Sequence, residues 1–385
     1  MHQRRIGAMV CAIVACAVAL SGLAACGSPA KEETIKIGVI ASITGSIPAV
    51  GKSTVDAANM AVKEVNDAGG LEIAGKKYKI ELFIEDDQDK KETAVSVAQK
   101  LINQSGVVAI VGPQASRNAI PAAEVAEGAH VPMISPWSTN PTTTLNKKYV
   151  FRAAFIDSFQ GRVMARFAIE QIGATKAAVL YDAASEYNRG IAEFFKEVYE
   201  QAGGQVVAFE IYTTGETDFS KQLTAIKDSG AQVVFLPNYY SEVPLQVEQA
   251  RALGIETPFI GADAWGGIEA QYLPALEGSY YSTHYATDIA SPVAQKFITA
   301  YQAAYGTVPD DVAALTYDAF GMLFEAMKSQ AKTDSESIRN GLAAISRYEG
   351  VTGTMEYKGT GDPVKSAVIL QVKDGKISFF RLAEP

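Results

Sequence analysis

The 385-residue chain has few of the residues from which metal centres and thiol chemistry are built. It contains three His and three Cys, and all three Cys lie within the first 26 residues. Structural zinc sites take four Cys or His ligands, so we expect no metal and no cofactor. Basic residues are also scarce, with 34 Lys and Arg against 43 Asp and Glu. Nucleic-acid-binding surfaces carry a basic excess, so we expect no nucleic-acid partner.

The N-terminal segment has no charged side chain between Arg5 and Lys31. Arg4 and Arg5 precede an uncharged, largely apolar run over 6–25, which is typical of a secretory signal. A run of this length also suffices to span a bilayer, so an uncleaved anchor helix stays open as an alternative. Both interpretations place the rest of the chain outside the cytoplasm and hold it to a membrane. After residue 30 no apolar run is long enough to cross one.

The sequence L-A-A-C-G at 23–27 resembles the lipobox of bacterial lipoproteins. The resemblance implies that residues 1–25 are a signal peptide and that Cys26 becomes the lipidated N-terminus. Residues 26–33, which are small and polar, then form a tether. The exported body would contain no other Cys, so it could form neither a disulfide nor a thiol nucleophile.

Strand and helix patterns alternate along the rest of the chain. Residues 34–41 have the pattern of a buried strand, and the helix pattern that follows ends at Gly69-Gly70. Further strands are predicted over 79–85, 107–111, 131–134, 177–181, 205–212, 233–236 and 259–261, with helical patterns between them. This alternation predicts an α/β fold of two doubly wound parallel-sheet lobes. A D-G turn joins a hairpin-like pair at 367–372 and 377–382 near the end.

Polar residues follow several of the predicted strands, where open α/β sheets bind their ligands. Ser116, Ser138 and Thr139 supply hydroxyl groups, and Ser116 stands at the start of a helix pattern. Helix N-termini favour anions, so this group could hold a carboxylate without a cation. The alternative is that Ser116 and Thr139 are only helix N-caps, a position that Ser and Thr favour.

Three further features near these loops have two interpretations each. Asp263 is either a turn residue or the countercharge of a ligand ammonium group. Trp137 and Trp265 are either core residues or walls of a pocket. The acidic run at 85–89 lacks the spacing of a calcium loop, and we interpret it as a solvated loop that caps the next helix.

No sequence motif indicates an enzyme. The chain has neither the G-x-S-x-G elbow nor the phosphate-binding loop G-x-x-x-x-G-K-[ST]. His130 and His284 have no evident serine partner in the sequence. We therefore expect a protein that is not an enzyme, and a surface hydrolase using Ser116 or Ser138 stays open as an alternative.

Several motifs in a fixed order resemble the Leu/Ile/Val-binding protein family, the type I periplasmic substrate-binding proteins of ABC importers. They are G-x-x-x-S at 112–116, V-P-M-I-S-P-W-S-T-N-P at 131–141, V-N-D-A-G-G at 65–70 and D-F-S at 218–220. The resemblance extends from residue 34 to about residue 382.

The resemblance implies two lobes that are joined by three crossings and close on a ligand. Lobe one would comprise 34–155 and 286–352, and lobe two 156–285 and 353–385. The family implies a monomer that delivers its ligand to an ABC permease and its ATPase. A ligand sensor without transport stays open as an alternative, because one fold serves both functions.

The family's binding residues map onto the loops already described. The resemblance implies that Ser116 and Thr139 bind an α-carboxylate, with Ser138 and backbone N–H groups beside them. The Trp137 carbonyl and the Asp263 carboxylate would hold the ammonium group. Two aromatic side chains of lobe two would close the cleft, and the matching positions are Tyr187 and Tyr239, with Tyr240 as the alternative to the second.

Two departures from the family pattern concern the ligand's side chain. Val50 stands where the family has an aromatic residue, and Trp137 stands where it has a small one. These departures reshape the side-chain pocket, so leucine, isoleucine and valine do not follow from the resemblance alone. With Asp263 as the countercharge of an ammonium group, we expect an amino acid, branched-chain or otherwise hydrophobic, as ligand. An amide, a polyamine or a small carboxylate stays open as an alternative.

Overall fold

The first of two large sheets is built from the N-terminal part of the chain. The computed structural model describes residues 33–288 and 291–385. This sheet has six strands in the order β2-β3-β1-β4-β5-β6, namely β1 (Glu33–Ala41), β2 (Leu71–Ile73), β3 (Lys76–Asp86), β4 (Ala109–Val111), β5 (Met133–Ser135) and β6 (Val150–Arg152). Strands β1, β4, β5 and β6 pair in parallel, and β2 and β3 form an antiparallel hairpin. The carboxyl ends of the parallel strands therefore lie at one edge.

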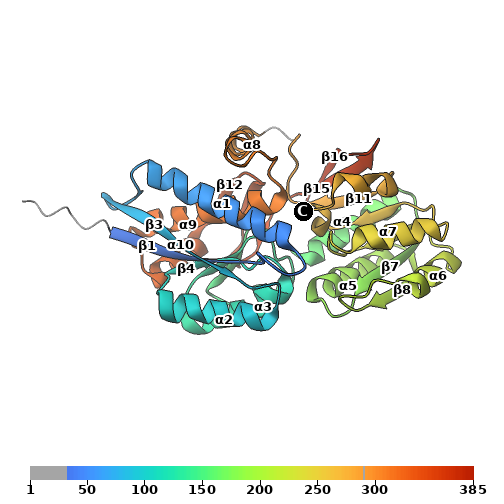
Figure 1. Ribbon diagram of the computed structural model, residues 1–385, viewed down its shortest axis with the longest axis horizontal. Helices are drawn as coiled ribbons and strands as arrows, with labels where there is room; N and C mark the ends of the chain where they lie inside the picture. The colour runs from blue at the N-terminus through green and yellow to red at the C-terminus, as the bar shows by residue number, and fades with distance from the viewer. Residues whose placement is uncertain (1–32, 289–290) are drawn as a thin grey trace, which may run out of the picture. The chain divides into compact units, whose positions relative to one another are not determined.

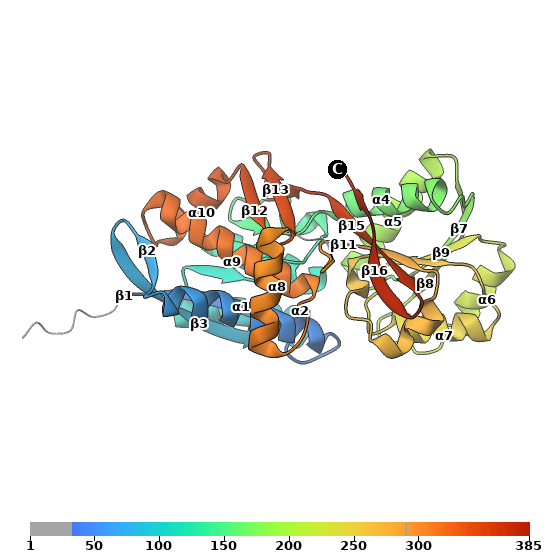
Figure 2. The same cartoon turned by 90° about the horizontal axis from the view of Figure 1, so that it is seen from above.

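Helices from two distant parts of the chain surround this sheet, and the helix at 292–305 lies outside the helix at 48–67 (Figures 1 and 2). They are α1 (Pro48–Asp67), α2 (Lys91–Lys100), α3 (Ser116–Ala129), α8 (Pro292–Tyr305), α9 (Asp311–Gln330) and α10 (Ser335–Ala344). Helix α1 packs against α9, which packs against α10, while α2 packs against α3. Most of α9 is apolar and buried, as expected of a helix enclosed on several sides. We call this sheet with its helices lobe one.

The second sheet has seven strands in the order β16-β15-β11-β10-β9-β7-β8. Its strands are β7 (Lys176–Asp182), β8 (Gln205–Tyr212), β9 (Val233–Leu236), β10 (Phe259–Gly261), β11 (Tyr280–Thr283), β15 (Ala367–Lys373) and β16 (Lys376–Ala383). Helices α4 (Asp157–Glu170), α5 (Glu186–Gln201), α6 (Ser220–Asp228) and α7 (Val243–Ala252) complete this group, which we call lobe two. The predicted C-terminal hairpin is confirmed, since β15 and β16 pair antiparallel.

The chain passes between the two lobes three times. The crossings follow β6, β11 and a small third sheet of β12 (Arg347–Gly350), β13 (Gly353–Tyr357) and β14 (Pro363–Val364). The predicted fold of two doubly wound lobes with three crossings is thereby confirmed. The residue numbers at which the lobes divide stay a prediction.

The elements that the sequence does not predict are mostly short. Strands β2, β6, β11, β12, β13 and β14 have two to five residues each, too few for a periodic pattern. The predicted signal peptide and Cys26 lie outside the described residues, and Glu33, at the end of the predicted tether, already belongs to β1. In the part of the chain that the structure describes, no helix is both long and apolar enough to cross a membrane.

Candidate ligand-binding site

Seven residues predicted from the sequence surround one cavity between the two lobes. The cavity is lined by Gln114, Ser116, Trp137, Ser138, Thr139, Tyr187, Tyr239 and Asp263. Seven of these eight are the predicted ligand-binding residues, and Gln114 is the one that the sequence does not predict. Tyr239 lines the cavity, whereas the alternative Tyr240 does not. The structure thus brings the predicted residues together, while their binding roles remain to be proposed.

Each lobe contributes the ends of its strands to this cavity. In lobe one, Gln114 and Ser116 follow β4, and Trp137, Ser138 and Thr139 follow β5. Lobe two contributes the second residue of α5, the loop after β9 and the loop after β10. These positions hold Tyr187, Tyr239 and Asp263 respectively. The cavity therefore lies where ligands of open α/β sheets bind.

The hydroxyl groups of lobe one form a hydrogen-bonded cluster. Ser138 Oγ lies 2.8 Å from Ser116 Oγ and 2.8 Å from Thr143 Oγ1. The alternative that Ser116 and Thr139 are helix N-caps is wrong. Ala115 occupies the N-cap position of α3, and Asn140 caps the short turn Pro141–Thr143. The hydroxyl groups of Ser116 and Thr139 therefore do not cap a helix N-terminus.

Arg152 holds the loop that carries Ser138 and Thr139. Its guanidinium is buried at the end of β6 and donates to the carbonyl oxygens of Ser138 at 2.8 Å and of Asn140 at 2.9 Å. It also donates to Thr144 Oγ1 at 2.8 Å and forms an ion pair with Asp362 at 2.6 Å. A planar group with several donors fixes these carbonyls rigidly. Arg152 thus holds the loop within lobe one, and the loop also contacts lobe two, because Asn140 Nδ2 donates to the Glu186 carbonyl oxygen at 2.8 Å.

Gly112 lets the other lobe-one loop approach β1. Its φ is +96°, and a Cβ atom there would lie 2.1 Å from the Ile40 carbonyl oxygen. No L-residue with a side chain fits that position without displacing the backbone. The glycine sets the direction in which the chain leaves β4 toward Gln114 and Ser116.

Asp263 is the acid of lobe two that faces the hydroxyl cluster. It is 1% exposed, and its Oδ1 accepts a hydrogen bond from Tyr187 Oη at 2.7 Å. Its Oδ2 lies 3.4 Å from His284 Nε2. Burial lowers the pKa of His284 to about 4, so the imidazole is neutral near pH 7 and leaves the Asp263 charge uncompensated. The carboxylate thus contacts side chains of two other parts of the chain, Tyr187 and His284, which disfavours the interpretation as a simple turn residue.

Asp157 is a second buried acid here, and the sequence does not predict it. It is the first residue of α4 and is fully buried, and neither carboxylate oxygen has a hydrogen-bond partner among the described residues. Burial raises its pKa to about 8, and the charge of Asp263 adds to the rise. The neighbouring Thr139 hydroxyl opposes the rise, although it makes no hydrogen bond of normal geometry. The sequence feature that could have identified Asp157 is an acidic residue at the start of the helix pattern that follows the first crossing.

Trp137 is anchored to lobe one by a third buried acid. Its Nε1 donates to Asp311 Oδ2 at 3.1 Å, and Thr283 Oγ1 donates to the same oxygen at 3.1 Å. Burial, followed by the charges of Asp310 and Asp263, raises the pKa of Asp311 to about 8. The Trp137 ring lies 6.1 Å from the Tyr239 ring across the cavity. Trp137 is therefore a wall of the cavity.

Trp265 has a different role from Trp137. It is fully buried, does not line the cavity, and donates from Nε1 to the Leu236 carbonyl oxygen at 2.9 Å. Its interpretation as a pocket wall is wrong, and it belongs to the core of lobe two.

The acidic run at 85–89 also differs from its predicted role. Asp87 and Asp89 are buried, and α2 begins after Lys90 without a side-chain cap. Asp89 instead pairs with Arg117, whose guanidinium lies 4.6 Å from the centre of the Tyr239 ring. The run thus supports a contact between the lobes rather than a solvated loop. Other contacts between the lobes include an ion pair of Lys91 with Glu186 at 2.6 Å and a hydrogen bond from Ala49 N to Tyr240 Oη at 3.2 Å.

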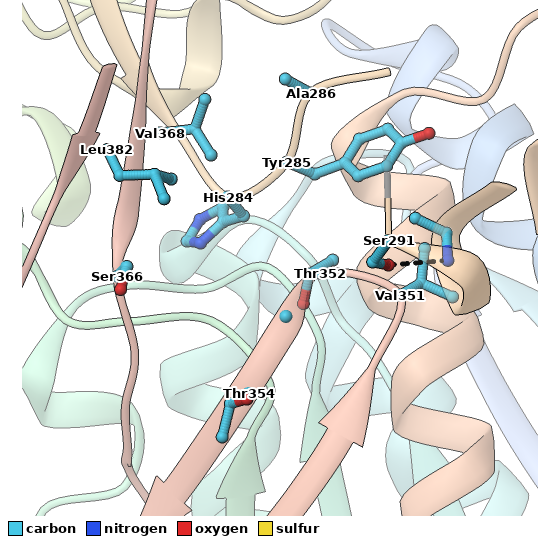
Figure 3. A pocket seen from close by; sticks show the side chains of 12 residues that line it. His284, Tyr285, Ala286, Ser291, Val351, Thr352, Thr354, Ser366, Val368 and Leu382 are labelled. Carbon is cyan, nitrogen blue, oxygen red and sulfur yellow. Dashed lines mark hydrogen bonds between the residues drawn. The ribbon is translucent and has the colours of Figure 1, made fainter. Parts of the chain in front are cut away.

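A larger cavity of about 250 Å³ lies beside the second and third crossings (Figure 3). Apart from His284, its walls carry only apolar side chains, hydroxyl groups and a glycine, contributed by Tyr285, Ala286, Ser291, Ala294, Val351, Thr352, Gly353, Thr354, Ser366, Val368 and Leu382. It has no carboxylate that could hold a cation. A further cavity of about 270 Å³ is lined by Asp288, Asp310 and Asp311, but no residue of the loops after β4 and β5 lines it. The smaller cavity combines an acid of lobe two with the hydroxyl groups of those loops, and we therefore take it as the candidate site.

The smaller cavity suits a zwitterion better than a covalent reaction. Ser116 and Ser138 bond to each other, and His284 contacts Asp263 rather than a serine. A serine nucleophile needs an adjacent base, so this arrangement does not support the hydrolase alternative. No group of three or more His, Cys, Asp or Glu side chains able to hold a metal occurs among the described residues. What the site offers is hydroxyl groups at one end and a carboxylate at the other.

Comparison with known proteins identifies close relatives over nearly the whole chain. The family model described as periplasmic binding protein matches residues 34–376. The leucine-, isoleucine-, valine-, threonine- and alanine-binding protein of Pseudomonas aeruginosa is 31% identical over 350 residues, covering 90% of this chain and 91% of that protein. The Leu/Ile/Val-binding protein homolog 3 of Brucella melitensis is 30% identical, with 90% and 94% covered.

Solved structures show the same fold. The leucine-binding protein LivK of Thermotoga maritima superposes with a TM-score of 0.85 at 32% identity, covering 91% of this chain and 99% of that one. The substrate-binding protein LivJ of Streptococcus pneumoniae, in complex with isoleucine, has a TM-score of 0.84 at 34% identity, with 92% and 100% covered. A benzoate complex from R. palustris, at 22% identity and a TM-score of 0.82, shares the fold.

The buried acids predict a specific pH dependence of stability. Folded Asp157, with a pKa of about 8, keeps a proton that the unfolded chain releases near its usual pKa of 3.8. Its contribution to the free energy of unfolding is therefore lost as the pH rises from about 4 to 8, by at most about 1.4 kcal/mol per pH unit. We expect Asp157→Asn to gain stability relative to the unmodified protein across this range, as measured by denaturant unfolding at pH 5, 6, 7 and 8.

The control is Asp228→Asn, at the exposed end of α6. The difference in the free energy of unfolding between this variant and the unmodified protein should not change with pH. His284, whose pKa is lowered, weakens both proteins equally as the pH falls from 6.5 toward 4, so it cancels in the comparison. A pH-independent difference for Asp157→Asn would contradict the assignment.

Proposed function

The chain belongs to the periplasmic binding protein family, in the group of the Leu/Ile/Val-binding proteins, and on that premise we propose that it captures an α-amino acid between its lobes. It then delivers the ligand to an ABC permease driven by its ATPase. We propose further that it acts outside the cytoplasm, as a monomer held to the membrane by a lipid on Cys26.

One observation carries the amino-acid proposal: the same cavity has hydroxyl groups on one side and a buried acid on the other. The carboxylate of the ligand lies against Ser116, Thr139 and the N-terminal N–H groups of α3, where the helix dipole favours an anion. Its ammonium group lies against Asp263, with the Trp137 carbonyl as a second acceptor. Asp157, buried behind Thr139 without a hydrogen-bond partner among the described residues, has a pKa raised to about 8, so it adds little negative charge at pH 7. A zwitterion thereby supplies each side with the charge it lacks.

The size of the cavity supports binding by movement of the lobes. Its volume is about 10 Å³, which is room for about one water molecule. Pockets for small ligands are much larger, about 300–1,000 Å³ for drug-sized molecules. An amino acid therefore enters only after the lobes separate, which breaks the contacts of Arg117 with Tyr239 and of Lys91 with Glu186, and the lobes then close around it with a wider cleft than the present one. Such hinge closure around a ligand is a known transition.

The names of the relatives agree with an amino acid. Leucine, isoleucine, valine, threonine and alanine are named for the relatives described above. The more distant benzoate-binding neighbour raises the alternative of a plain carboxylic acid. Asp263 argues against that alternative, because a benzoate brings no cation to a buried carboxylate, and such a charge is costly when unpaired.

The lipoprotein proposal is supported by the sequence at 23–27 and by the family. The motif L-A-A-C-G follows an uncharged run of signal-peptide length. A single acyl chain binds membranes only weakly, whereas two or more anchor a protein stably. A lipobox Cys modified on both sulfur and amine meets that requirement.

We expect Asp263→Asn to weaken binding of the amino acid tenfold or more, since each factor of ten corresponds to about 1.4 kcal/mol. The protein is first unfolded and refolded to remove bound ligand. A thermal-shift panel of the twenty amino acids, their amides, short carboxylates and polyamines then identifies the ligand, because a ligand at 100 times its Kd adds about 2.7 kcal/mol of stability. Calorimetric titration measures the Kd of both proteins, with Asp228→Asn as the control.

Three outcomes would count against the proposal. An unchanged Kd for Asp263→Asn removes this acid from the site. A response to amides or polyamines alone overturns the amino-acid ligand. A response to none of the panel overturns the binding function itself.

Replacing Cys26 with Ser should abolish lipid attachment. Cells expressing the full chain with labelled palmitate should yield a labelled protein in the membrane fraction, and the Cys26→Ser variant should take up no label. Cys16→Ser, which changes a Cys inside the apolar run, is the matched control and should be labelled normally. Labelling that persists in Cys26→Ser would show that the segment at 23–27 is not a lipobox.

A further inference from the structure

Gln114 is a buried polar side chain that faces the cavity with one end unsatisfied. It follows β4 two residues before Ser116, and it has no exposed surface. Its Nε2 donates to Thr316 Oγ1 on α9 at 3.2 Å. Its Oε1 has no hydrogen-bond partner among the described residues. A buried amide oxygen without a hydrogen-bond partner is destabilising, so a partner is expected from the ligand.

Trp137 stands at the same side of the cavity and limits its size. The hydrogen bond from Trp137 Nε1 to Asp311 Oδ2 ties the indole to the first residue of α9. Gln114 is tied to the same helix through Thr316. Both anchors belong to lobe one, so the two side chains keep their places when the lobes separate. They form a preformed wall that does not depend on closure.

Elimination of the lining residues that already have a role indicates that this wall contacts the ligand's side chain. In the proposed function, Ser116 and Thr139 take the carboxylate, and Asp263 takes the ammonium group with Tyr187 bonded to it. Ser138 Oγ is already engaged with two hydroxyl groups. The lining residues left over are Gln114, Trp137 and Tyr239, one amide between two aromatic rings.

We propose that the cleft selects an α-amino acid with a short, uncharged side chain that ends in a hydroxyl or carboxamide group. Trp137 limits the length of that side chain, and the free end of the Gln114 amide bonds its polar group. A hydroxyl or a carboxamide both donates and accepts, so it satisfies the Gln114 amide in either orientation. An aliphatic side chain of the same size leaves the amide buried and unsatisfied. The inference rests on the proposed function, because it takes the orientation of the ligand from it.

Threonine and valine provide the direct test, because they have nearly the same shape and differ by one hydroxyl group. Calorimetric titration of the refolded, full-length protein should give a Kd for threonine at least tenfold lower than for valine. Asparagine and leucine form a second pair of similar size and should follow the same order. The variant Gln114→Leu should reduce the threonine preference to threefold or less, and the matched control Gln201→Leu, on the exposed end of α5, should preserve it.

The outcomes separate this inference from the proposed function. Valine binding as tightly as threonine to the unmodified protein overturns the polar subsite and leaves the amino-acid function standing. A threonine preference that survives in Gln114→Leu overturns the role of Gln114. If Gln114→Leu does not fold, the comparison of the four ligands on the unmodified protein still decides. Absence of binding by all four and by every other amino acid overturns the proposed function instead.

Discussion

Burying an ionised carboxyl group without a cationic partner costs several kcal/mol. The region between the lobes buries three aspartic acid side chains, none of which has such a partner in the part of the chain that the structure describes. Asp157, Asp263 and Asp311 lie on three different elements, and none forms an ion pair with a Lys or Arg among the described residues. Burial raises the pKa of Asp157 and of Asp311 to about 8. The nearby cations have other partners, since Arg117 pairs with Asp89, Arg152 with Asp362, and the buried Lys365 donates to Thr352 Oγ1 at 2.5 Å. Buried acids of this kind lower the stability of the fold and cluster at functional sites. The function that this arrangement suits is to receive a positive charge from a ligand.

The fold supplies the opposite end of the site by purely local means. Parallel strands bring the loops after β4 and β5 to one edge, and the N-terminus of α3 begins in the first of them. Arg152 then fixes the second loop through two carbonyl oxygens. The hydroxyl groups therefore stay in place within lobe one, while Tyr187, Tyr239 and Asp263 approach from lobe two. A site divided in this way is complete only when the lobes are closed, which links binding to a change of shape that a permease can recognise.

The residues at strand ends could be predicted, and those defined by their surroundings could not. Ser116, Thr139 and Asp263 follow strands that the alternation of patterns predicts, and the family resemblance assigns them together. Gln114 and Asp157 stand in equally visible positions, but what marks them is a missing hydrogen-bond partner, and that is a property of the packed structure. Trp137 and Trp265 both follow strands, yet one bonds Asp311 at the cavity and the other bonds Leu236 in the core. Asp87 and Asp89 are a further case. A run of acidic residues predicts exposure, whereas their burial depends on contacts of the folded chain, such as the ion pair of Asp89 with Arg117.

We propose that the ligand's ammonium group pairs with Asp263, beside two further carboxyl groups, Asp157 and Asp311, whose raised pKa keeps them largely protonated at pH 7. The most direct measurement is titration calorimetry with the best-binding amino acid at pH 7, in two buffers of different ionisation enthalpy. The account predicts that binding releases protons, because the incoming positive charge lowers the pKa of Asp157 and of Asp311 from about 8. The same heat in both buffers, or an uptake of protons, would contradict the placement of the ammonium group at Asp263, beside these two acids.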